Sequence, residues 1–195
     1  MAPYEEGCEG AFLPPQSRYC IPPSVRAVVG NTNDLYVGWS DVEANQSDGI
    51  RFARLSPALR LLTPPRRLGP PDRTVSDQFD PSLAVDASDG TLWACYMDTF
   101  GDPYRHEAWP TCTASRNDGR TWAVPVRVAD RASDETQTAA NQRGYGSTAL
   151  VAANGVAHPM WTDTRDLVEQ SEEIYVARLP ERALEVRTSN GMTTR

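Results

Sequence analysis

The stretch Leu92-Trp93-Ala94-Cys95-Tyr96-Met97-Asp98 decides the fold, because two other stretches repeat its pattern. These are Leu35-Tyr36-Val37-Gly38-Trp39-Ser40-Asp41 and Val156-Ala157-His158-Pro159-Met160-Trp161-Thr162-Asp163. Each stretch is rich in residues that favour β-strands and ends in an aromatic residue, one further residue and an aspartate. Such self-similarity is typical of a repeated supersecondary unit, so the chain is built from copies of one small motif.

The repeat extends to both sides of each stretch. A short apolar run and a turn precede it, in the pairs Val25–Val29 with Gly30-Asn31, Ser82–Val85 with Asp89-Gly90, and Thr148–Ala152 with Asn154-Gly155. Asn-Gly and Asp-Gly between two β-like runs are strong hairpin signals. A third strand is expected at Ile50–Leu55, Trp109–Ser115 and Ile174–Leu179, and a fourth at Leu59–Leu62, Thr121–Val128 and Ala183–Val186. The unit is therefore a four-stranded antiparallel meander, and the chain should contain very little helix.

This repeat predicts an all-β fold, a β-propeller of four-stranded antiparallel blades, because so small a sheet buries both faces only when copies stack around an axis. Residues 1–24 form a proline-rich leader, and residues 25–195 form three blades at about 25–69, 77–129 and 145–188. Propellers close with about four to eight blades, so we expect an incomplete ring with two exposed apolar faces. Either the chain belongs to a larger propeller, or two chains form a dimer that completes one ring.

The positions of Cys95 and Cys112 are compatible with a disulfide across a β-hairpin. If Cys95 faces Cys112 in an antiparallel pair, then Asp98 faces Trp109, and residues 99–108 form the loop. A cross-strand disulfide is therefore expected, together with an oxidising compartment. A second pair would close a short loop in the leader, Cys8 with Cys20. The alternative is that all the cysteines are free, buried thiols in a reducing cytosol.

A turn motif lies between the third and fourth strands of the middle unit, Ser115-Arg116-Asn117-Asp118-Gly119-Arg120-Thr121-Trp122. It resembles the Asp-box, the S-x-D-x-G-x-T-W signature of sialidase-type and other BNR-repeat propellers. The matching residues are Ser115, Gly119, Thr121 and Trp122, while Asn117 stands at the usual aspartate position with Asp118 beside it. Asn and Asp side chains bond their own backbone in turns, and glycine supplies a positive φ. We therefore interpret the motif as structural.

The wider sequence, over about residues 25–188, also resembles bacterial sialidase-like blades, notably at Phe79–Asp86 and Gly155–Arg165. The resemblance implies a glycoside hydrolase of the exo-α-sialidase type, if the chain is active. Sialidases use three arginines on the substrate carboxylate, a tyrosine nucleophile with a glutamate base, and an aspartate acid. The arginine of the family's Arg-Ile-Pro motif has no counterpart here, because the nearest string, Arg26-Ala27-Val28, does not match. No catalytic residue is therefore carried over.

The strand order predicts that a ligand would bind at one particular face of the propeller. In a four-stranded blade, the loops between the second and third strands lie on the same side as the connections between blades. The candidate ligand-binding residues on this face are Asp41, Asp98, Arg105, Arg143, Asp163 and Arg165, and the candidate catalytic residues are Asp98 and Tyr145. Carboxylates and arginines around a pocket suit a polar, sugar-like or acidic ligand. The alternative is structural, because a carboxylate at a strand end accepts N–H bonds from the following loop.

Composition narrows the function classes. The formal net charge of −7 opposes nucleic-acid binding, which needs a basic footprint. No apolar run is long enough for a membrane-spanning helix, and the first residues do not form a signal peptide. The expected disulfide nevertheless favours a secreted or extracytoplasmic location. We expect no metal or other cofactor, with calcium at Asp98–Asp102 as the alternative.

Two functional hypotheses follow from these patterns. The first is a glycan-active or glycan-binding propeller of the sialidase type. The second is a non-catalytic propeller that serves as an interaction module, and a truncated fragment without independent function is a third interpretation. An arginine cluster that converges on one acidic pocket would favour the first.

Overall fold

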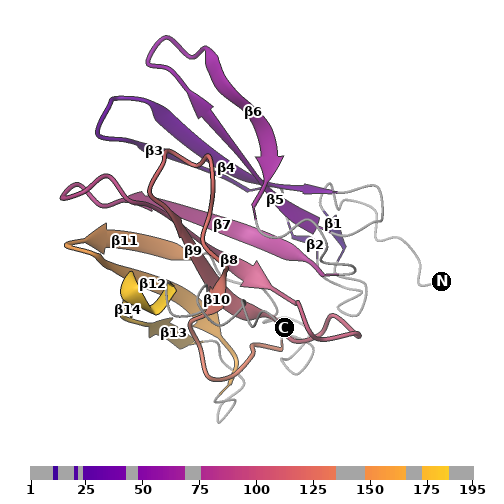
Figure 1. Cartoon of the computed structure of the whole chain (residues 1–195). Helices are drawn as coiled ribbons and strands as arrows, with labels where there is room; N and C mark the ends of the chain where they lie inside the picture. The colour runs from indigo at the N-terminus through magenta and orange to yellow at the C-terminus, as the bar shows by residue number, and fades with distance from the viewer. Residues whose placement is uncertain are drawn as a thin grey trace, which may run out of the picture.

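The computed structural model describes residues 11–12, 20–21, 24–42, 48–68, 76–134, 148–165 and 173–184. These residues form three antiparallel sheets of four strands each and one two-stranded sheet. Figure 1 shows the larger sheets stacked face to face, with the middle sheet between the other two. The all-β, four-stranded prediction is confirmed, and the described residues do not close a ring.

The strands follow the order of the predicted repeat. The first sheet is β3-β4-β5-β6, with β3 at Val25–Val29, β4 at Leu35–Val42, β5 at Asp48–Leu55 and β6 at Leu61–Arg67. The middle sheet is β10-β9-β8-β7, with β7 at Gln78–Val85, β8 at Leu92–Asp98, β9 at Trp109–Ser115 and β10 at Val126–Arg127. The third sheet contains β11 at Ala149–Ala153, β12 at Val156–Asp163, β13 at Glu173–Val176 and β14 at Leu179–Pro180. The two-stranded sheet pairs β1 (Ala11–Phe12) with β2 (Cys20–Ile21).

The hairpin between β11 and β12 shows how local sequence sets the strand pairing. Ala153 faces Val156, so only Asn154 and Gly155 form the turn. Their φ angles are 53° and 74°, which is the left-handed geometry that matches the twist of two antiparallel strands. The Asn-Gly hairpin prediction is therefore confirmed. In Figure 1 the turns of the three first hairpins all lie on the left.

The predicted register of the β8–β9 hairpin is confirmed. Cys95 faces Cys112, and Asp98 faces Trp109. The two cysteines form a disulfide, and both are buried. The second predicted pair includes Cys8, which lies outside the described residues.

The fourth strands differ from the prediction. In the first sheet β6 begins at Leu61, because Leu59 has a φ of 57° and belongs to the turn. In the middle sheet only Val126–Arg127 pairs with β9, and the preceding Pro125 has no N–H to offer the ladder. The strand expected at Ala183–Val186 is wrong, because residues 182–184 form a single helical turn that buries Leu184.

The actual fourth strand of the third sheet lies earlier in the chain. β14 pairs with β12 at Val156 and Ala157, and β11 pairs with the same two residues. A strand has two edges, so β14 must lie on the edge that β13 also uses. β13 and β14 therefore lie one after the other along the same edge of β12.

The core lies between neighbouring sheets. Residues of β8 alternate between two clusters: Leu92, Ala94 and Tyr96 pack towards the first sheet, and Trp93 and Cys95 pack towards the third. All of β8 is buried, as expected for a strand with a sheet against each face. The first strands, β3, β7 and β11, meet because β7 contacts both of the others. This is the radial order of a propeller, in which first strands line the axis.

Candidate functional site

Where they are described, parts of the loops predicted to share one face lie together, and we call this region the loop end (residues 76–77, 99–108, 128–134 and 164–165). The backbone N–H of Asp77 donates to Oγ1 of Thr99 at 2.8 Å. Ala108 and Ser133 exchange backbone hydrogen bonds of 2.8 and 2.9 Å. Oγ of Ser133 lies 3.2 Å from Oγ1 of Thr164. The β8–β9 loop, the segment after β10 and the end of β12 are thus held together.

Arg105 is buried in an ion pair at the loop end. Its Nε donates to Oδ2 of Asp77 at 2.5 Å, and its Nη2 donates to the other carboxylate oxygen. The Asp77 side chain has no exposed surface, so the pair is shielded from water. Arg105 also has a φ of 59°, in the left-handed region. This candidate ligand-binding arginine is therefore committed to holding the loop against the start of β7.

Asp98 and Asp163 have the geometry expected of carboxylates that hold the loop after their strand, which is the structural alternative to ligand binding. Oδ1 of Asp98 accepts the N–H of Phe100 at 2.8 Å, and Oδ1 of Asp163 accepts the N–H of Arg165 at 2.9 Å. Both aspartates are buried. By contrast, the third repeat position, Asp41, is half exposed and lies 3.5 Å from Nε of Arg51. Two of the repeated aspartates are therefore bonded to the loop that follows them, and the third is half exposed.

Asp102 organises the β8–β9 loop. Its carboxylate accepts the backbone N–H groups of Tyr104, His106 and Glu107 at 2.6 to 2.9 Å. Burial alone would raise the pKa of Asp102, but these three hydrogen bonds outweigh it and lower the pKa. The carboxylates of Asp98 and Asp102 are thus engaged with protein groups. Among the described residues, no cluster of three or more His, Cys, Asp or Glu side chains could hold a metal ion, and calcium at Asp98–Asp102 stays a prediction.

Arg165 lies where the third sheet meets the loop end. Its guanidinium lies 4.4 Å from the Tyr175 ring centre, and its Nε donates to Oδ2 of Asp163 at 2.9 Å. It also pairs with Asp130, whose side chain is 80% exposed. Burial alone would lower the pKa of Arg165, but the two carboxylates hold it above the usual range. Arg165 is therefore a fixed positive charge with one solvent-exposed partner.

A polar cavity of about 380 Å³ opens beside Arg165. Its lining comes from the β8–β9 loop, the start of β9, the segment after β10 and the end of β12: Glu107, Trp109, Asp130, Arg131, Ala132, Asp134, Thr164 and Arg165. An indole ring, three carboxylates and two guanidinium groups thus border one opening. Of the candidate ligand-binding residues predicted from the sequence, Arg165 is in this lining.

Asp80, on β7, the first strand of the middle sheet, has a carboxyl group with a raised pKa. Asp80 has a φ of 51° where the β7–β8 register shifts between Phe79 and Ser82. Asp80 is 8% exposed, and burial raises the pKa of its carboxyl group to about 6. The hydrogen bond from the Thr148 N–H and the positive charge of Arg26 act in the opposite direction and lower that pKa. Sequence reasoning missed this residue. The signal that could have found it is Pro81, since a proline within a strand marks an edge or a bulge.

At the opposite end of the sheets, polar side chains form a closed network. We call this the turn end (residues 30–34, 86–91, 115–122 and 154–155). In the turn motif, Oγ of Ser115 accepts the N–H of Gly119, and Oδ1 of Asn117 accepts the N–H of Thr121, both at 2.9 Å.

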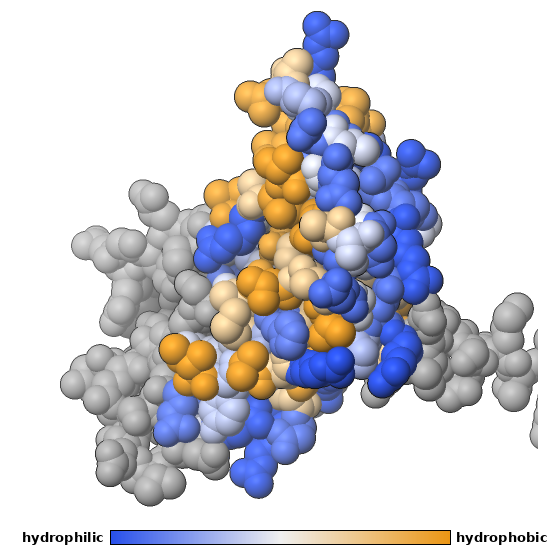
Figure 2. Space-filling model, turned by 90° about the vertical axis from the view of Figure 1, so that its left-hand side faces the viewer, coloured by the Kyte–Doolittle hydropathy of each residue, from blue (hydrophilic) through white to orange (hydrophobic). Residues whose placement is uncertain are grey.

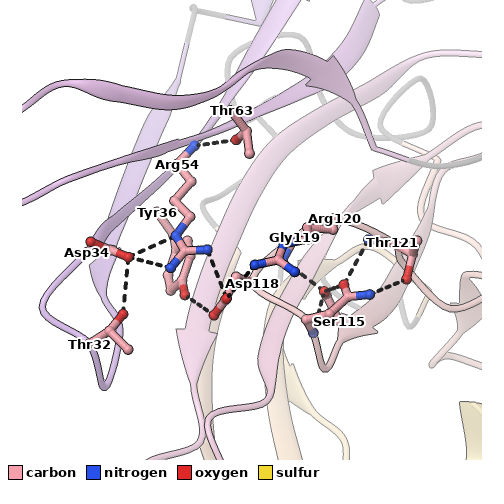
Figure 3. A network of polar contacts seen from close by, with 11 residues as sticks. Thr32, Asp34, Tyr36, Arg54, Thr63, Ser115, Asp118, Gly119, Arg120 and Thr121 are labelled. Carbon is pink, nitrogen blue, oxygen red and sulfur yellow. Dashed lines mark hydrogen bonds and ion pairs between the residues drawn. The ribbon is translucent and has the colours of Figure 1, made fainter.

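Asp118 of the same motif joins the middle sheet to the first (Figure 3). Its carboxylate accepts hydrogen bonds from the Tyr36 hydroxyl and from Nη1 of Arg54, both at 2.8 Å. Burial and this contact raise the pKa of Tyr36 to about 12. The remaining motif residue, Trp122, meets Phe52 edge-on at 5.2 Å between ring centres.

The predicted residues Arg143 and Tyr145 lie outside the described residues. In the described part of the chain, no helix has the length and apolar character needed to span a membrane.

Comparison with known proteins shows the fold. No protein-family model and no curated protein sequence matches the chain. Among solved structures, Hadza microbial sialidase Hz136 is 15% identical over 80% of this chain and 34% of its own length, with a TM-score of 0.53. The α-L-arabinanase of Penicillium chrysogenum, solved with arabinobiose, is 17% identical over 82% of this chain and 46% of its own, with a TM-score of 0.58. A thermostable family-43 glycoside hydrolase is 8% identical over 80% and 53%, with a TM-score of 0.50. The chain therefore shares the fold of β-propeller glycoside hydrolases and spans between a third and about half of their length.

Proposed function

We propose that the chain is a glycan-processing β-propeller unit that binds its glycan in the loop-end cavity. The cavity itself carries this proposal, because sugars are commonly held by an aromatic ring with carboxylates and arginines around it. Trp109 supplies the ring, and Glu107, Asp130 and Asp134 supply acceptors for sugar hydroxyl groups. The fold shared with glycoside hydrolases supports the same class of ligand.

Sialidase-type exo-glycosidase activity is the more specific form of the proposal. The turn motif supports it, because it resembles the Asp-box and its Asn117 side chain accepts a backbone N–H of the turn, as that resemblance implies. The similarity to an arabinanase gives an α-L-arabinofuranosidic bond as the competing substrate. The Cys95–Cys112 disulfide supports an extracytoplasmic location.

The proposal includes additional sheets on both sides of the three described here. The outer faces of the first and third sheets expose apolar side chains that a propeller would cover, namely Val25, Val29, Val151, Ile174 and Val176. A hydrophobic band is also visible from the left-hand side of Figure 1, between hydrophilic flanks (Figure 2). The additional sheets belong either to a longer chain or to a second copy. Light scattering distinguishes these, because a second copy doubles the molar mass in solution.

A glycoside panel tests the proposed function. The chain is incubated with the methylumbelliferyl glycosides of sialic acid and α-L-arabinofuranose, and binding of the corresponding oligosaccharides is measured by calorimetry. Trp109→Ala should weaken binding by about tenfold or more through loss of the ring. Tyr104→Ala is the matched control, because Tyr104 is an exposed aromatic residue at the same end that does not line the cavity.

The outcomes separate the functional classes. Turnover that falls in Trp109→Ala but not in Tyr104→Ala supports a glycosidase. Binding without turnover leaves a glycan-binding module. A folded chain that neither binds nor cleaves any of these glycans contradicts the proposal and favours the interaction-module alternative.

A further inference from the structure

Trp109, the aromatic residue that lines the loop-end cavity, begins β9 and is half-buried. An indole ring that is partly in water can turn about its side-chain bonds, and a ligand that stacks on it must first hold it in one orientation. A ring that the protein already holds binds more tightly, because the ligand does not have to order it. The contacts that fix the indole therefore affect how tightly the cavity binds a ligand.

Arg127, on the edge strand β10, covers the Trp109 ring. Its Cζ atom lies 3.7 Å from the centre of the ring, which is a distance of direct stacking contact. By comparison, Cζ of Arg165 lies 4.4 Å from the Tyr175 ring centre and 5.9 Å from the Trp161 ring centre. Tryptophan is the ring that attracts a guanidinium most strongly. Arg127 is exposed and is not part of the cavity lining.

The β8–β9 loop holds the same guanidinium. Nη2 of Arg127 donates a hydrogen bond to the backbone carbonyl of Phe100. A methyl group at the next residue, Gly101, would lie 3.1 Å from this nitrogen, so the loop backbone is packed against the guanidinium. Gly101 also has a φ of 93°, a conformation that glycine adopts without steric cost. The guanidinium is therefore held by both the loop backbone and the indole.

Asp98 connects this loop to the hairpin that carries the indole. Its Oδ1 accepts the N–H of Phe100 at 2.8 Å, so the N–H and the carbonyl of Phe100 are both bonded. Asp98 also faces Trp109 across the β8–β9 hairpin. The contacts from the aspartate through the loop and the arginine thus return to the same hairpin. Rotation of the indole would break its contact with a guanidinium that the loop also holds.

We propose that Arg127 is a positioning residue that holds the Trp109 ring in the orientation in which it stacks on a glycan, an inference that rests on the proposed function. Arg127 acts through the ring and does not itself contact the glycan. Without it the indole turns, and the glycan has to order the ring on binding. Ordering one side chain of this kind corresponds to a loss of affinity of about threefold to tenfold.

The test is a double-mutant cycle, measured by calorimetry on the panel oligosaccharide that the wild-type chain binds most tightly. Arg127→Gln removes the guanidinium and should weaken binding by about threefold to tenfold. In the Trp109→Ala background the same change should have no further effect, because no ring is left to position. A glycan that contacted Arg127 directly would instead lose affinity in both backgrounds.

Arg66→Gln is the matched control. Arg66 is also an exposed arginine on a strand, and its Nη1 donates to a backbone carbonyl, that of Arg120, at 3.0 Å. That carbonyl belongs to the turn end and not to the loop end. The Arg66→Gln variant should therefore bind the oligosaccharide as tightly as the wild-type chain does.

A fluorine NMR measurement reports the state of the ring directly and needs no ligand. In the full chain labelled with 5-fluorotryptophan, the signal of Trp109 is the one that is missing from Trp109→Ala. Arg127→Gln should shift or broaden this signal, and Arg66→Gln should leave it unchanged. In Arg127→Gln the signals of the other four tryptophans should keep their positions, which separates a local change at one ring from loss of the fold.

The outcomes separate this inference from the proposed function. Weaker binding by Arg127→Gln that disappears in the Trp109→Ala background, together with a changed Trp109 signal, supports the role of Arg127. Unchanged binding by Arg127→Gln, an equal loss in both backgrounds, or an unchanged Trp109 signal overturns this role and leaves the proposed function standing. No glycan binding by the folded wild-type chain overturns the proposed function and the role of Arg127 with it.

Discussion

Both ends of the stacked sheets contain carboxylates bonded to protein groups, and the loop end has in addition an exposed carboxylate beside a polar cavity. At the turn end, Asp118 is bonded to Tyr36 and Arg54, and Asp86 is bonded to Ser88 and Gly155. At the loop end, Asp130 is mostly exposed and borders a polar cavity. Asp80, near the same end of β7, is buried, with one carboxylate oxygen accepting the Thr148 N–H and the other 3.7 Å from Nη2 of Arg26.

The difference indicates which end is scaffold and which is available to a ligand. Groups of the turn end bond residues from neighbouring sheets, so a change there should alter stability. Asp130, which borders the cavity, is mostly exposed, so a change there should alter binding more than stability.

The largest effect is expected at the turn end, from Gly119→Ala. A methyl group at Gly119 would lie 2.2 Å from Cε1 of Phe52, and the φ of 76° disfavours any side chain. We expect a loss of about 3 to 5 kcal/mol, from overpacking together with left-handed strain. The matched control is Gly155→Ala, with a φ of 74° and nothing within 4 Å, which should cost only about 1 to 2 kcal/mol. Equal losses in chemical denaturation would show that the turn end is not tightly packed.

The next effect concerns the hairpin that connects both ends. Replacing Cys95 and Cys112 together by serine removes a disulfide across 17 residues of sequence separation. The expected loss is about 3 kcal/mol under oxidising conditions. Hydrogen exchange should show reduced protection at both ends of β8 and β9. Free thiols in the native protein, detected by mass spectrometry, would contradict this expectation.

A pH titration of stability should distinguish Asp80 from Asp86. The pKa of Asp80 is raised in the fold to about 6, so its contribution is fully present below pH 4 and is lost as the pH rises through about 6. The corresponding change in unfolding free energy is about 2 to 3 kcal/mol. Asp86 has the opposite sign, because its lowered pKa makes stability fall in acid. Urea unfolding from pH 4 to 7 should show the first slope in the wild-type chain and not in Asp80→Asn, and the same slope in both would refute the assignment.

The smallest effect on stability is expected at the cavity. Asp130→Asn removes an exposed charge and should change the free energy of unfolding by less than about 0.5 kcal/mol. Asp163→Asn is the contrasting variant, because this buried carboxylate is bonded to both Trp161 and Arg165. A melting temperature that falls as far in Asp130→Asn as in Asp163→Asn would remove the distinction between scaffold and cavity.

Local patterns in the sequence predicted most of the fold. Short apolar runs, turn residues and the repeated aromatic-x-Asp motif predict the positions of β3 to β5, β8, β9, β11 and β12. The pairing of Cys95 with Cys112 follows from hairpin geometry alone. The prediction fails at the fourth strands, where the third unit buries Leu184 in a helical turn and places β14 beside β12. That choice depends on packing against the middle sheet, which no local pattern encodes.

The roles of the candidate site residues were harder to predict from the sequence than the strands were. Arg105, Asp98 and Asp163 are near the predicted face, but their bonds to other protein groups decide that they hold loops. Burial raises the pKa of Asp80, and the groups that oppose this shift, Arg26 and Thr148, are distant from it in the sequence.

The amino-acid sequence by itself determined that the described part of the chain contains three four-stranded antiparallel sheets, because strand pairing within a hairpin involves neighbours in the chain. Only the tertiary structure decided which carboxylates are buried against partners and which are exposed. The reason is physical: burial and ion pairing depend on groups that sheet stacking brings together, and those groups have no fixed spacing along the chain.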